Sequence, residues 1–115
     1  MRRRTVRAAT IDRTLAALAD PTRRRLLDHV SRRPQRPSDL GRGLPMTRPA
    51  VSKHLRVLRQ AGLVEAVPRG REMLYRLSTQ PTSLLAAHVY IDRLSRNWER
   101  ALERFKAFAE LEENA

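Results

Sequence analysis

A short amphipathic helix is the clearest pattern in the chain and lies within residues 46–65. Three aliphatic side chains recur there at helical spacing and form one apolar stripe: Val51, Leu55 and Leu58. Thr47 is a good N-cap, Pro49 is tolerated in the first turn, and Gly62 can end the helix in a left-handed conformation. Because the stripe must face a core, the opposite, polar face of this helix is predicted to be exposed.

Three shorter helices are predicted before this one from aliphatic side chains at helical spacing. They cover about residues 10–19, 21–32 and 37–43. Asp20 and Pro21 form a typical start signal for the second of them, an N-cap residue followed by proline at the first helical position. Since only a short turn separates the third helix from the amphipathic one, the pair matches a helix-turn-helix.

After the amphipathic helix the pattern changes to the alternation that is typical of strands. Residues 63–67 and 73–77 are predicted to form two strands, separated by a loop of residues 68–72. The loop carries Arg69 and Arg71, so the tip of the hairpin is basic. A hairpin that directly follows a helix-turn-helix is a wing, and these two arginines could enter a minor groove. The alternative is an ordinary solvated turn.

One long helix is predicted over residues 82–113. Six apolar positions in it step by 3, 4, 3, 4 and 3 residues: Ile91, Leu94, Trp98, Ala101, Phe105 and Phe108. A repeat near 3.5 is typical of a seam for another helix, and this seam is too long for a small winged domain to cover. We therefore expect a symmetric homodimer. The predicted dimer interface comprises Ile11, Leu15, Ile91, Leu94, Trp98, Leu102 and Phe105. The alternatives are packing on its own domain or on a different protein.

The charge of the chain indicates a polyanionic partner. The formal net charge is +12, and residues 1–76 hold 19 Lys or Arg against 6 Asp or Glu, whereas residues 77–115 hold 5 against 6. The excess thus lies in the half that contains the amphipathic helix. The exposed face of that helix mixes cations with small side chains: Arg48, Ala50, Ser52, Lys53, Arg56 and Arg59, with His54 near its boundary. Small residues allow close approach to base edges, and Arg or Lys can bind guanine or phosphate oxygens. We interpret this helix as a recognition helix for double-stranded DNA; the alternative is the ordinary polar face of a surface helix.

Together these elements predict a mainly α fold with a small β-hairpin wing, in the order α-α-α-α-β-β-α. A length of 115 residues fits one structural domain. We expect a basic arm at residues 1–9, a winged helix-turn-helix DNA-binding domain at residues 10–81, and a C-terminal dimerisation helix at residues 82–115. The arm could contact phosphates or an adjacent minor groove. Its alternative is a disordered tail.

The chain lacks the residues that several classes of protein need for their function. The chain has no cysteine, so it has neither disulfides nor thiolate metal sites. It has no glycine-rich phosphate loop, and its three histidines are not spaced as a triad or a hydrolytic metal centre. We therefore expect no enzyme and no cofactor. No apolar run has the length of an export signal or a membrane span, so the expectation is a soluble, cytoplasmic protein.

Two runs resemble the ArsR-type (ArsR/SmtB) winged helix-turn-helix repressors, LADPTRRRLLDHV at residues 18–30 and PSDLGRGLPMTRPAVSKHLRVLRQAGLVEAVPRGREMLYRLS at residues 37–78. The resemblance extends over about residues 10–112. It implies a dimer that is held by the first and last helices. This dimer would bind an imperfect palindrome that overlaps a promoter and would thereby repress that promoter. The resemblance places on the groove-contacting face Thr47, Arg48, Pro49, Ala50, Ser52, Lys53 and His54, and on the wing Arg69 and Arg71. With Arg56, these are the predicted DNA-binding residues.

The chain lacks the metal-ligand residues of the metal-sensing members of the family that it resembles. Such members carry a Cys-x-Cys pair where this chain has Arg36 and Ser38, and neither side chain can hold a soft metal. Other members use Asp, His and Glu of the last helix, where this chain offers His88 and Asp92 without a second histidine at the expected distance. We therefore expect no metal site. The last helix is more similar to members without a recognised metal site, which are often autorepressors. The resemblance does not identify an inducer. The alternatives are a metal-responsive repressor that uses His88 and Asp92, and a non-specific DNA-binding chromosomal protein.

Overall fold

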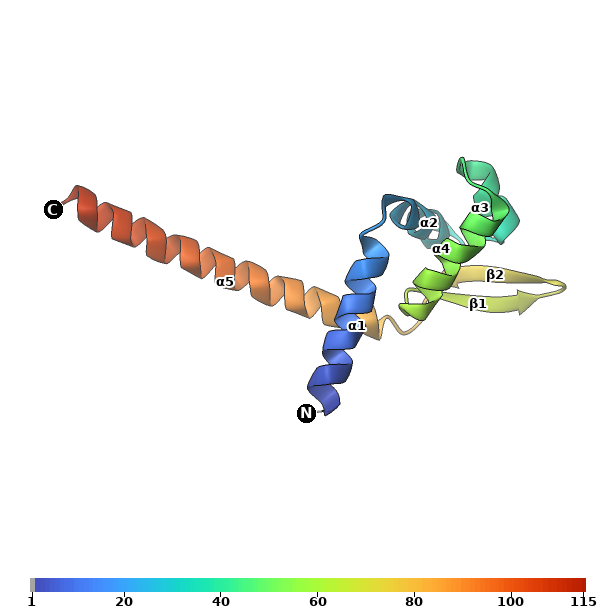
Figure 1. The fold of residues 1–115 in the computed structure, drawn as a ribbon, viewed down its shortest axis with the longest axis horizontal. Helices are drawn as coiled ribbons and strands as arrows, with labels where there is room; N and C mark the ends of the chain where they lie inside the picture. Colours follow the sequence, from blue (N-terminus) through green and yellow to red (C-terminus); the bar gives the residue numbers. More distant parts are fainter. Residues whose placement is uncertain (1) are drawn as a thin grey trace.

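Five helices and one two-stranded hairpin make up the computed structural model, which describes residues 2–115 and the side chains of residues 8–115. Their order is α1 (Arg2–Leu18), α2 (Pro21–Arg32), α3 (Pro37–Gly43), α4 (Arg48–Gln60), β1 (Val64–Arg69), β2 (Glu72–Leu77) and α5 (Thr82–Glu113). Helices α1 to α4 and the hairpin gather at one end, and α5 leaves this group as a straight rod (Figure 1). The predicted fold class is confirmed.

Side-chain caps start the helices on either side of α3. At α2, Asp20 Oδ1 accepts hydrogen bonds from the backbone N–H groups of Thr22 and Arg23, at 2.8 and 3.1 Å. At α4, Thr47 Oγ1 accepts one from the backbone N–H of Ala50, at 3.3 Å. Such bonds satisfy backbone donors that have no partner inside the helix. The boundaries of the helix-turn-helix therefore lie where the sequence predicted them.

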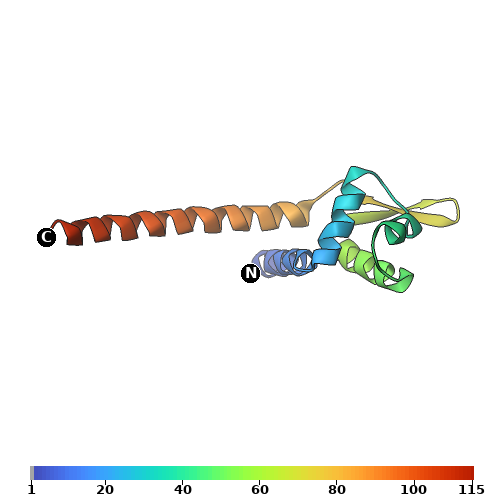
Figure 2. The same cartoon turned by 90° about the horizontal axis from the view of Figure 1, so that it is seen from above.

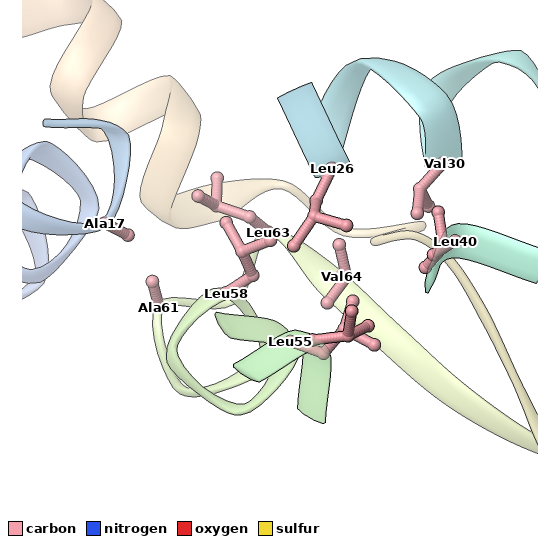
Figure 3. Close-up of a cluster of buried hydrophobic side chains, with 10 residues drawn as sticks. Ala17, Leu26, Val30, Leu40, Leu55, Leu58, Ala61, Leu63 and Val64 are labelled. Atoms are coloured by element: carbon pink, nitrogen blue, oxygen red, sulfur yellow. The ribbon is translucent and has the colours of Figure 1, made fainter. Parts of the chain in front are cut away.

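The core is built from aliphatic side chains of α2, α3, α4 and β1, and α1 contributes one small residue at its side (Figure 3). Its fully or almost fully buried members are Ala17, Leu26, Val30, Leu40, Val51, Leu55, Leu58, Ala61, Leu63 and Val64. Burying one Leu or Val side chain stabilises a fold by about 1.5–3 kcal/mol. This cluster therefore fixes α4 to the rest of the domain by its apolar stripe.

Helix α1 is longer than predicted, because it begins at Arg2 instead of near Thr10. The predicted arm is therefore helical from residue 2 to residue 9, and Met1 lies outside the described residues. These eight positions are mostly Arg and Ala, which have high helix propensity, and they contain no Gly or Pro to stop the helix. Contact of this basic segment with DNA stays a prediction.

The strands of the hairpin are longer than predicted, and the loop between them is shorter. They pair antiparallel from Val64↔Leu77 to Arg69↔Glu72, so the predicted five-residue loop shrinks to Gly70 and Arg71. Gly70 has φ +66°, a conformation that tight two-residue hairpin turns require and glycine adopts without strain. Pro68 is tolerated within β1 because each strand of a two-stranded hairpin has a free edge. The wing is therefore an extended ribbon with a short tip.

Helix α5 stands clear of the other elements over most of its length (Figure 2). Ser83 and Ala87 in its first turns are buried, but from residue 88 to residue 113 none of its side chains is. The radius of gyration is 19.9 Å, whereas a compact domain of this length has about 13 Å. None of the described helices, α5 included, has the length and apolar character needed to cross a membrane. The apolar seam of this long helix therefore has no packing partner within the described part of one chain.

Candidate nucleic-acid interface

Helix α4 presents a polar face to solvent because its opposite stripe is completely buried. The three stripe residues, Val51, Leu55 and Leu58, have no exposed surface. Six predicted contact residues of this helix and its cap are exposed: Thr47, Arg48, Pro49, Ser52, Lys53 and Arg56. Ala50 and His54 are half-buried. The structure thus brings small polar groups and cations together on one side of a rigid helix.

The cations on this face have no carboxylate partner in the described part of the chain. The ion pairs there join Arg23 to Asp20, Arg36 to Glu72, Arg76 to Glu65, and Arg96 to Asp92. Arg48, Lys53 and Arg56 belong to none of these pairs. Binding to phosphates would therefore break no salt bridge of the protein and would release counterions from the DNA.

His54 lies at the edge of the polar face instead of in its middle. Its Nδ1 is enclosed and has no hydrogen-bond partner among the described residues. The ring is close enough to the start of α2 to act on Asp20, whose pKa is lowered chiefly by the backbone N–H of Arg23 and to a smaller extent by His54. The prediction that His54 contacts DNA therefore depends on the part of its ring that remains exposed.

The wing carries its cations at the tip, away from the core. Arg69 and Arg71 are exposed and, like the cations of α4, take part in none of the ion pairs of the described side chains. The hairpin projects from the domain next to α4, in the direction opposite to α5 (Figure 1). Its two arginines can therefore approach the backbone or minor groove of a duplex that α4 contacts through the major groove.

A close junction joins the end of α4 to the hairpin and to the start of α5. The Leu63 N–H donates to Leu58 O at 3.0 Å, and the Ser78 N–H donates to Leu63 O at 3.0 Å. Gly62 has φ +76°, and a Cβ at this position would lie 3.0 Å from Ser83 Oγ. Glycine therefore suits this position, because other residues rarely adopt this backbone conformation and the Ser83 side chain leaves little room for a Cβ.

Glu65 of β1 fastens the segment that leads into α5, a role that sequence reasoning missed. One carboxylate oxygen accepts from the backbone N–H and the hydroxyl of Thr79, both at 2.9 Å, while the other accepts from Arg76 Nε at 3.2 Å. These bonds, that of the Thr79 N–H first, hold the pKa of Glu65 below its usual value. Its partners lie 11 and 14 residues further along the chain, so no local pattern could have revealed them.

The base of the wing is also tied to the segment before α3. Buried Gln35 and Tyr75 of β2 exchange backbone hydrogen bonds of 2.9 and 2.8 Å, and Arg36 Nη1 forms an ion pair with Glu72 Oε2 at 2.9 Å. Arg36, which stands where metal-sensing members of the resembled family carry a cysteine, thus contacts the wing. These links position the hairpin relative to the helix-turn-helix.

Replacing Glu65 with Gln should weaken the acid dependence of stability. Because the folded-state pKa of Glu65 is lowered, its stabilising effect is present above the unfolded-state pKa and is lost as the pH falls through the folded-state value. We expect the free energy of urea unfolding to fall less for Glu65→Gln than for the unmodified protein between about pH 5 and pH 3.

The control for this prediction is Glu99→Gln, a change at an exposed position of α5 that forms none of the ion pairs found among the described side chains. Its acid dependence should match that of the unmodified protein. An equal loss of stability on acidification in all three proteins would contradict the assigned role of Glu65.

The two residues considered for a metal site on α5 are not arranged as a ligand set. The carboxylate of Asp92 is bound by Arg96, and this bond lowers the pKa of Asp92. His88, one turn before it, is exposed. Within the part of the chain that the structure describes, no group of three or more His, Asp or Glu residues is placed to hold a metal ion.

A family model described as a helix-turn-helix domain matches residues 18–67. The chain is 44% identical over 91 residues to the HTH-type transcriptional regulator Rv2034 of Mycobacterium tuberculosis, covering 79% of this chain and 80% of that protein. A solved ArsR-like transcriptional regulator from Rhodococcus sp. RHA1 superposes with a TM-score of 0.74 at 36% identity, over 89% of this chain and 94% of that one.

A third match is a homodimeric winged helix-turn-helix DNA-binding domain from Mycobacterium bovis, described as a possible ArsR-family transcriptional regulator. Its TM-score is 0.67 at 25% identity, over 81% of this chain and 86% of that one. The fold and its exposed basic helix and hairpin thus define a winged helix-turn-helix DNA-binding regulator of transcription. Within that class, the chain belongs to the ArsR family.

Proposed function

We propose that this protein is a homodimeric repressor that binds an imperfect palindromic operator overlapping a promoter, with its own promoter as the first candidate. The observation that supports this proposal is that two surfaces have no partner among the described residues. One is the set of cations on α4 and the wing that form no ion pair there; the other is the apolar seam of α5. The first suits DNA, and the second suits another copy of the same helix. Its activity would be binding, not catalysis, and it would act in the cytoplasm, where the DNA is.

The exposure of the α5 seam supports the homodimer. Trp98 is 65% exposed and Phe105 is 70% exposed in the single chain, and Ile91, Leu94 and Leu102 are each 45% or more exposed. A stripe of large apolar side chains marks an interaction surface when it is contiguous. A symmetric pair places two recognition helices on one duplex, as a palindrome requires. The homodimeric state of the solved M. bovis relative supports the same arrangement.

Selection of genomic fragments by the purified protein tests this function. Sequencing the retained DNA should give a small set of fragments that share one palindromic sequence next to a promoter, and footprinting should locate it. Competition with unrelated duplex then gives the ratio of specific to non-specific affinity. A ratio near one, with fragments retained at random, would instead indicate the non-specific chromosomal protein that the charge alone permits.

Substitutions in α4 and in the wing should have different effects on operator binding. Ser52→Ala or Arg48→Ala should change which bases are preferred, because a recognition helix contacts base edges in the major groove. Arg69→Ala or Arg71→Ala should weaken all duplexes more evenly, because phosphate contacts position the protein without specifying sequence. Loss of one good base contact typically costs about 1–3 kcal/mol at the contacted position.

Competition between matched and singly mutated operators measures this difference. Glu103→Gln is a suitable control, because Glu103 is exposed on α5, forms none of the ion pairs among the described side chains and is not a predicted DNA contact. Equal losses on matched and mismatched operators for Ser52→Ala would argue against base contacts at that position.

Zinc, cadmium or nickel at stoichiometric concentration should not release the protein from its operator. Arg36 and Ser38 offer no thiolate, and His88 with Asp92 supplies too few ligands for a closed tetrahedral site. A gel-shift titration with each metal would measure the effect. Metal-dependent release that disappears in His88→Ala would instead support the metal-responsive alternative.

A further inference from the structure

Three consecutive arginines, Arg23, Arg24 and Arg25, lie in the first turns of α2. Cations at the start of a helix oppose its dipole, so α2 itself gives no reason for them to be there. The structure gives a reason for Arg23, whose side chain turns back to the end of α1. Its Nε donates to Ala17 O at 2.8 Å, and its Nη2 donates to Ala16 O at 2.9 Å.

These bonds cap α1 from a neighbouring helix. The last four carbonyl groups of a helix have no partner within it, and α1 has no basic side chain in its last turn and no glycine directly after it. Arg24 Nη1 donates to Leu18 O at 2.6 Å, so the two arginines together bind three of these four groups. The Arg23 side chain is only 18% exposed and also lies 3.6 Å from Asp20 Oδ2. Its guanidinium is therefore held between two helices.

Side-chain packing gives this junction little support. Ala17 is the fully buried apolar side chain in the described part of α1, and it brings one methyl group to the core, with half-buried Leu18 beside it. A cleft of about 480 Å³, lined by Arg23, Val57 and Gln60, separates the last turns of α1 from the end of α4. The direction of α1 relative to α4 therefore depends strongly on the hydrogen bonds of Arg23.

This junction connects the two functional parts of the proposed dimer. Helix α1 lies across the first turns of α5 (Figure 1), so the two helices assigned to the second copy form one platform. The platform meets the DNA-contacting part at two places. One is the start of α5, held through Gly62 and Glu65, and the other is the end of α1, held by Arg23. Two attachments fix an angle that a single attachment would leave free.

The angle between these two parts decides which operator a dimer fits. Recognition helices in successive major grooves are about 34–36 Å apart, so each lies about 17 Å from the twofold axis. A rotation of about 10° moves a point at that radius by about 3 Å, close to the rise of about 3.4 Å between neighbouring base pairs. A small loosening of one attachment would thus let the dimer fit half-sites that are one base pair nearer or further apart.

We propose that Arg23 is a positioning residue that sets the spacing between the two half-sites of the operator. It acts through α1 and not through a contact with DNA, because its guanidinium is already bound to the carbonyl groups of that helix. This inference rests on the proposed homodimeric repressor function. It adds to that function by assigning part of the operator choice to a residue outside the DNA-contacting face.

Operators with identical half-sites and different spacings test the proposal. The unmodified protein should bind the natural spacing at least about tenfold more tightly than a spacing one base pair longer or shorter, because the misfit must be absorbed by deforming the duplex. Arg23→Gln should reduce this preference to about threefold or less. Arg25→Gln is the matched control, because Arg25 is exposed and takes part in none of the ion pairs of the described side chains. It should keep the full preference.

Arg23→Lys separates the geometry of the guanidinium from its charge. Lysine keeps the positive charge but lacks the planar fork that reaches two carbonyl groups at once, so its spacing preference should fall as in Arg23→Gln. If Arg23 instead contacted a phosphate, Arg23→Gln would weaken all spacings equally and flatten the salt dependence, and Arg23→Lys would restore both. That result would overturn the proposal, as would an equal effect of Arg23→Gln and Arg25→Gln.

A distance measurement without DNA makes the test independent of the operator. The chain has no cysteine, so spin labels can be attached through Arg42→Cys on α3 and Glu103→Cys on α5, both at exposed positions. Excess unmodified protein ensures that each dimer carries one labelled subunit. In pulsed electron paramagnetic resonance, Arg23→Gln should shift or broaden the distance between the labels by about 3 Å, whereas Arg25→Gln should not.

An unchanged distance distribution in Arg23→Gln would overturn the proposal. Circular dichroism would show whether that variant is folded, and Arg23→Lys decides the question if it is not. A monomer in sedimentation, or failure to select any operator, would refute the proposed repressor function. The distance between the labels within one chain would still decide whether Arg23 fixes the platform against the DNA-contacting part.

Discussion

Trp98→Ala is expected to give folded monomers that no longer bind the operator tightly. Trp98 is the largest side chain of the α5 seam and is 65% exposed in the single chain. Its replacement therefore removes little that the single chain buries, and the loss should fall on association. Truncating a buried aromatic side chain typically costs about 3–5 kcal/mol, and every 1.4 kcal/mol changes a dissociation constant about tenfold. We expect dimerisation to weaken by two orders of magnitude or more.

The loss of operator binding follows from geometry. Two recognition helices must enter successive major grooves about 34–36 Å apart, so a monomer contacts one half-site. Sedimentation equilibrium would measure association, circular dichroism would report whether the chain is folded, and a gel shift would measure operator affinity.

Arg100→Ala is the control, because Arg100 lies about 160° around α5 from Trp98. It should leave the dimer intact. A Trp98→Ala protein that remains a folded dimer with unchanged operator affinity would refute the proposed seam and would place the dimer contact elsewhere.

Operator affinity should fall on the order of a thousandfold when the salt concentration rises from about 50 to 200 mM. The reason is that α4 and the wing tip present cations that form none of the ion pairs among the described side chains. Each phosphate that they neutralise would release counterions from the duplex. The measurement is a series of binding titrations in which the logarithm of affinity is plotted against the logarithm of salt concentration.

Arg56→Gln tests whether α4 contributes to this slope. Loss of one phosphate contact in each subunit should reduce the magnitude of the slope by about one for each contact removed. The neighbouring control is Gln60→Ala, which removes no charge from the same helix. A slope of magnitude about 1 or 2 for the unmodified protein would show that the basic half of the chain is not the DNA surface.

Local sequence signals predicted most of the helix-turn-helix because each acts within one or two turns. The Asp20 and Thr47 caps and the aliphatic spacing of Val51 and Leu55 fix where α2 and α4 begin and which side of α4 is buried. The wing was predicted for the same reason, since alternation and turn residues are local. Its length was not, because the pairing of residues 68 and 69 with residues 73 and 72 depends on the partner strand.

The start of α1 could not be predicted from apolar spacing. Among its first eight residues only Val6 has a large apolar side chain, so no apolar spacing marks the start. Helix propensity without periodicity is a weak signal.

The sequence by itself determined the fold class, the buried stripe and polar face of α4, and the apolar seam of α5, because periodicity and caps depend on neighbours along the chain. The tertiary structure alone decided that Arg36 and Arg76 form ion pairs, since Glu72 and Glu65, their partners, are distant in sequence. It also decided that His54 turns one ring nitrogen into the protein and that Glu65 holds the entry to α5. These facts depend on contacts between elements, and such contacts exist only after the chain has packed.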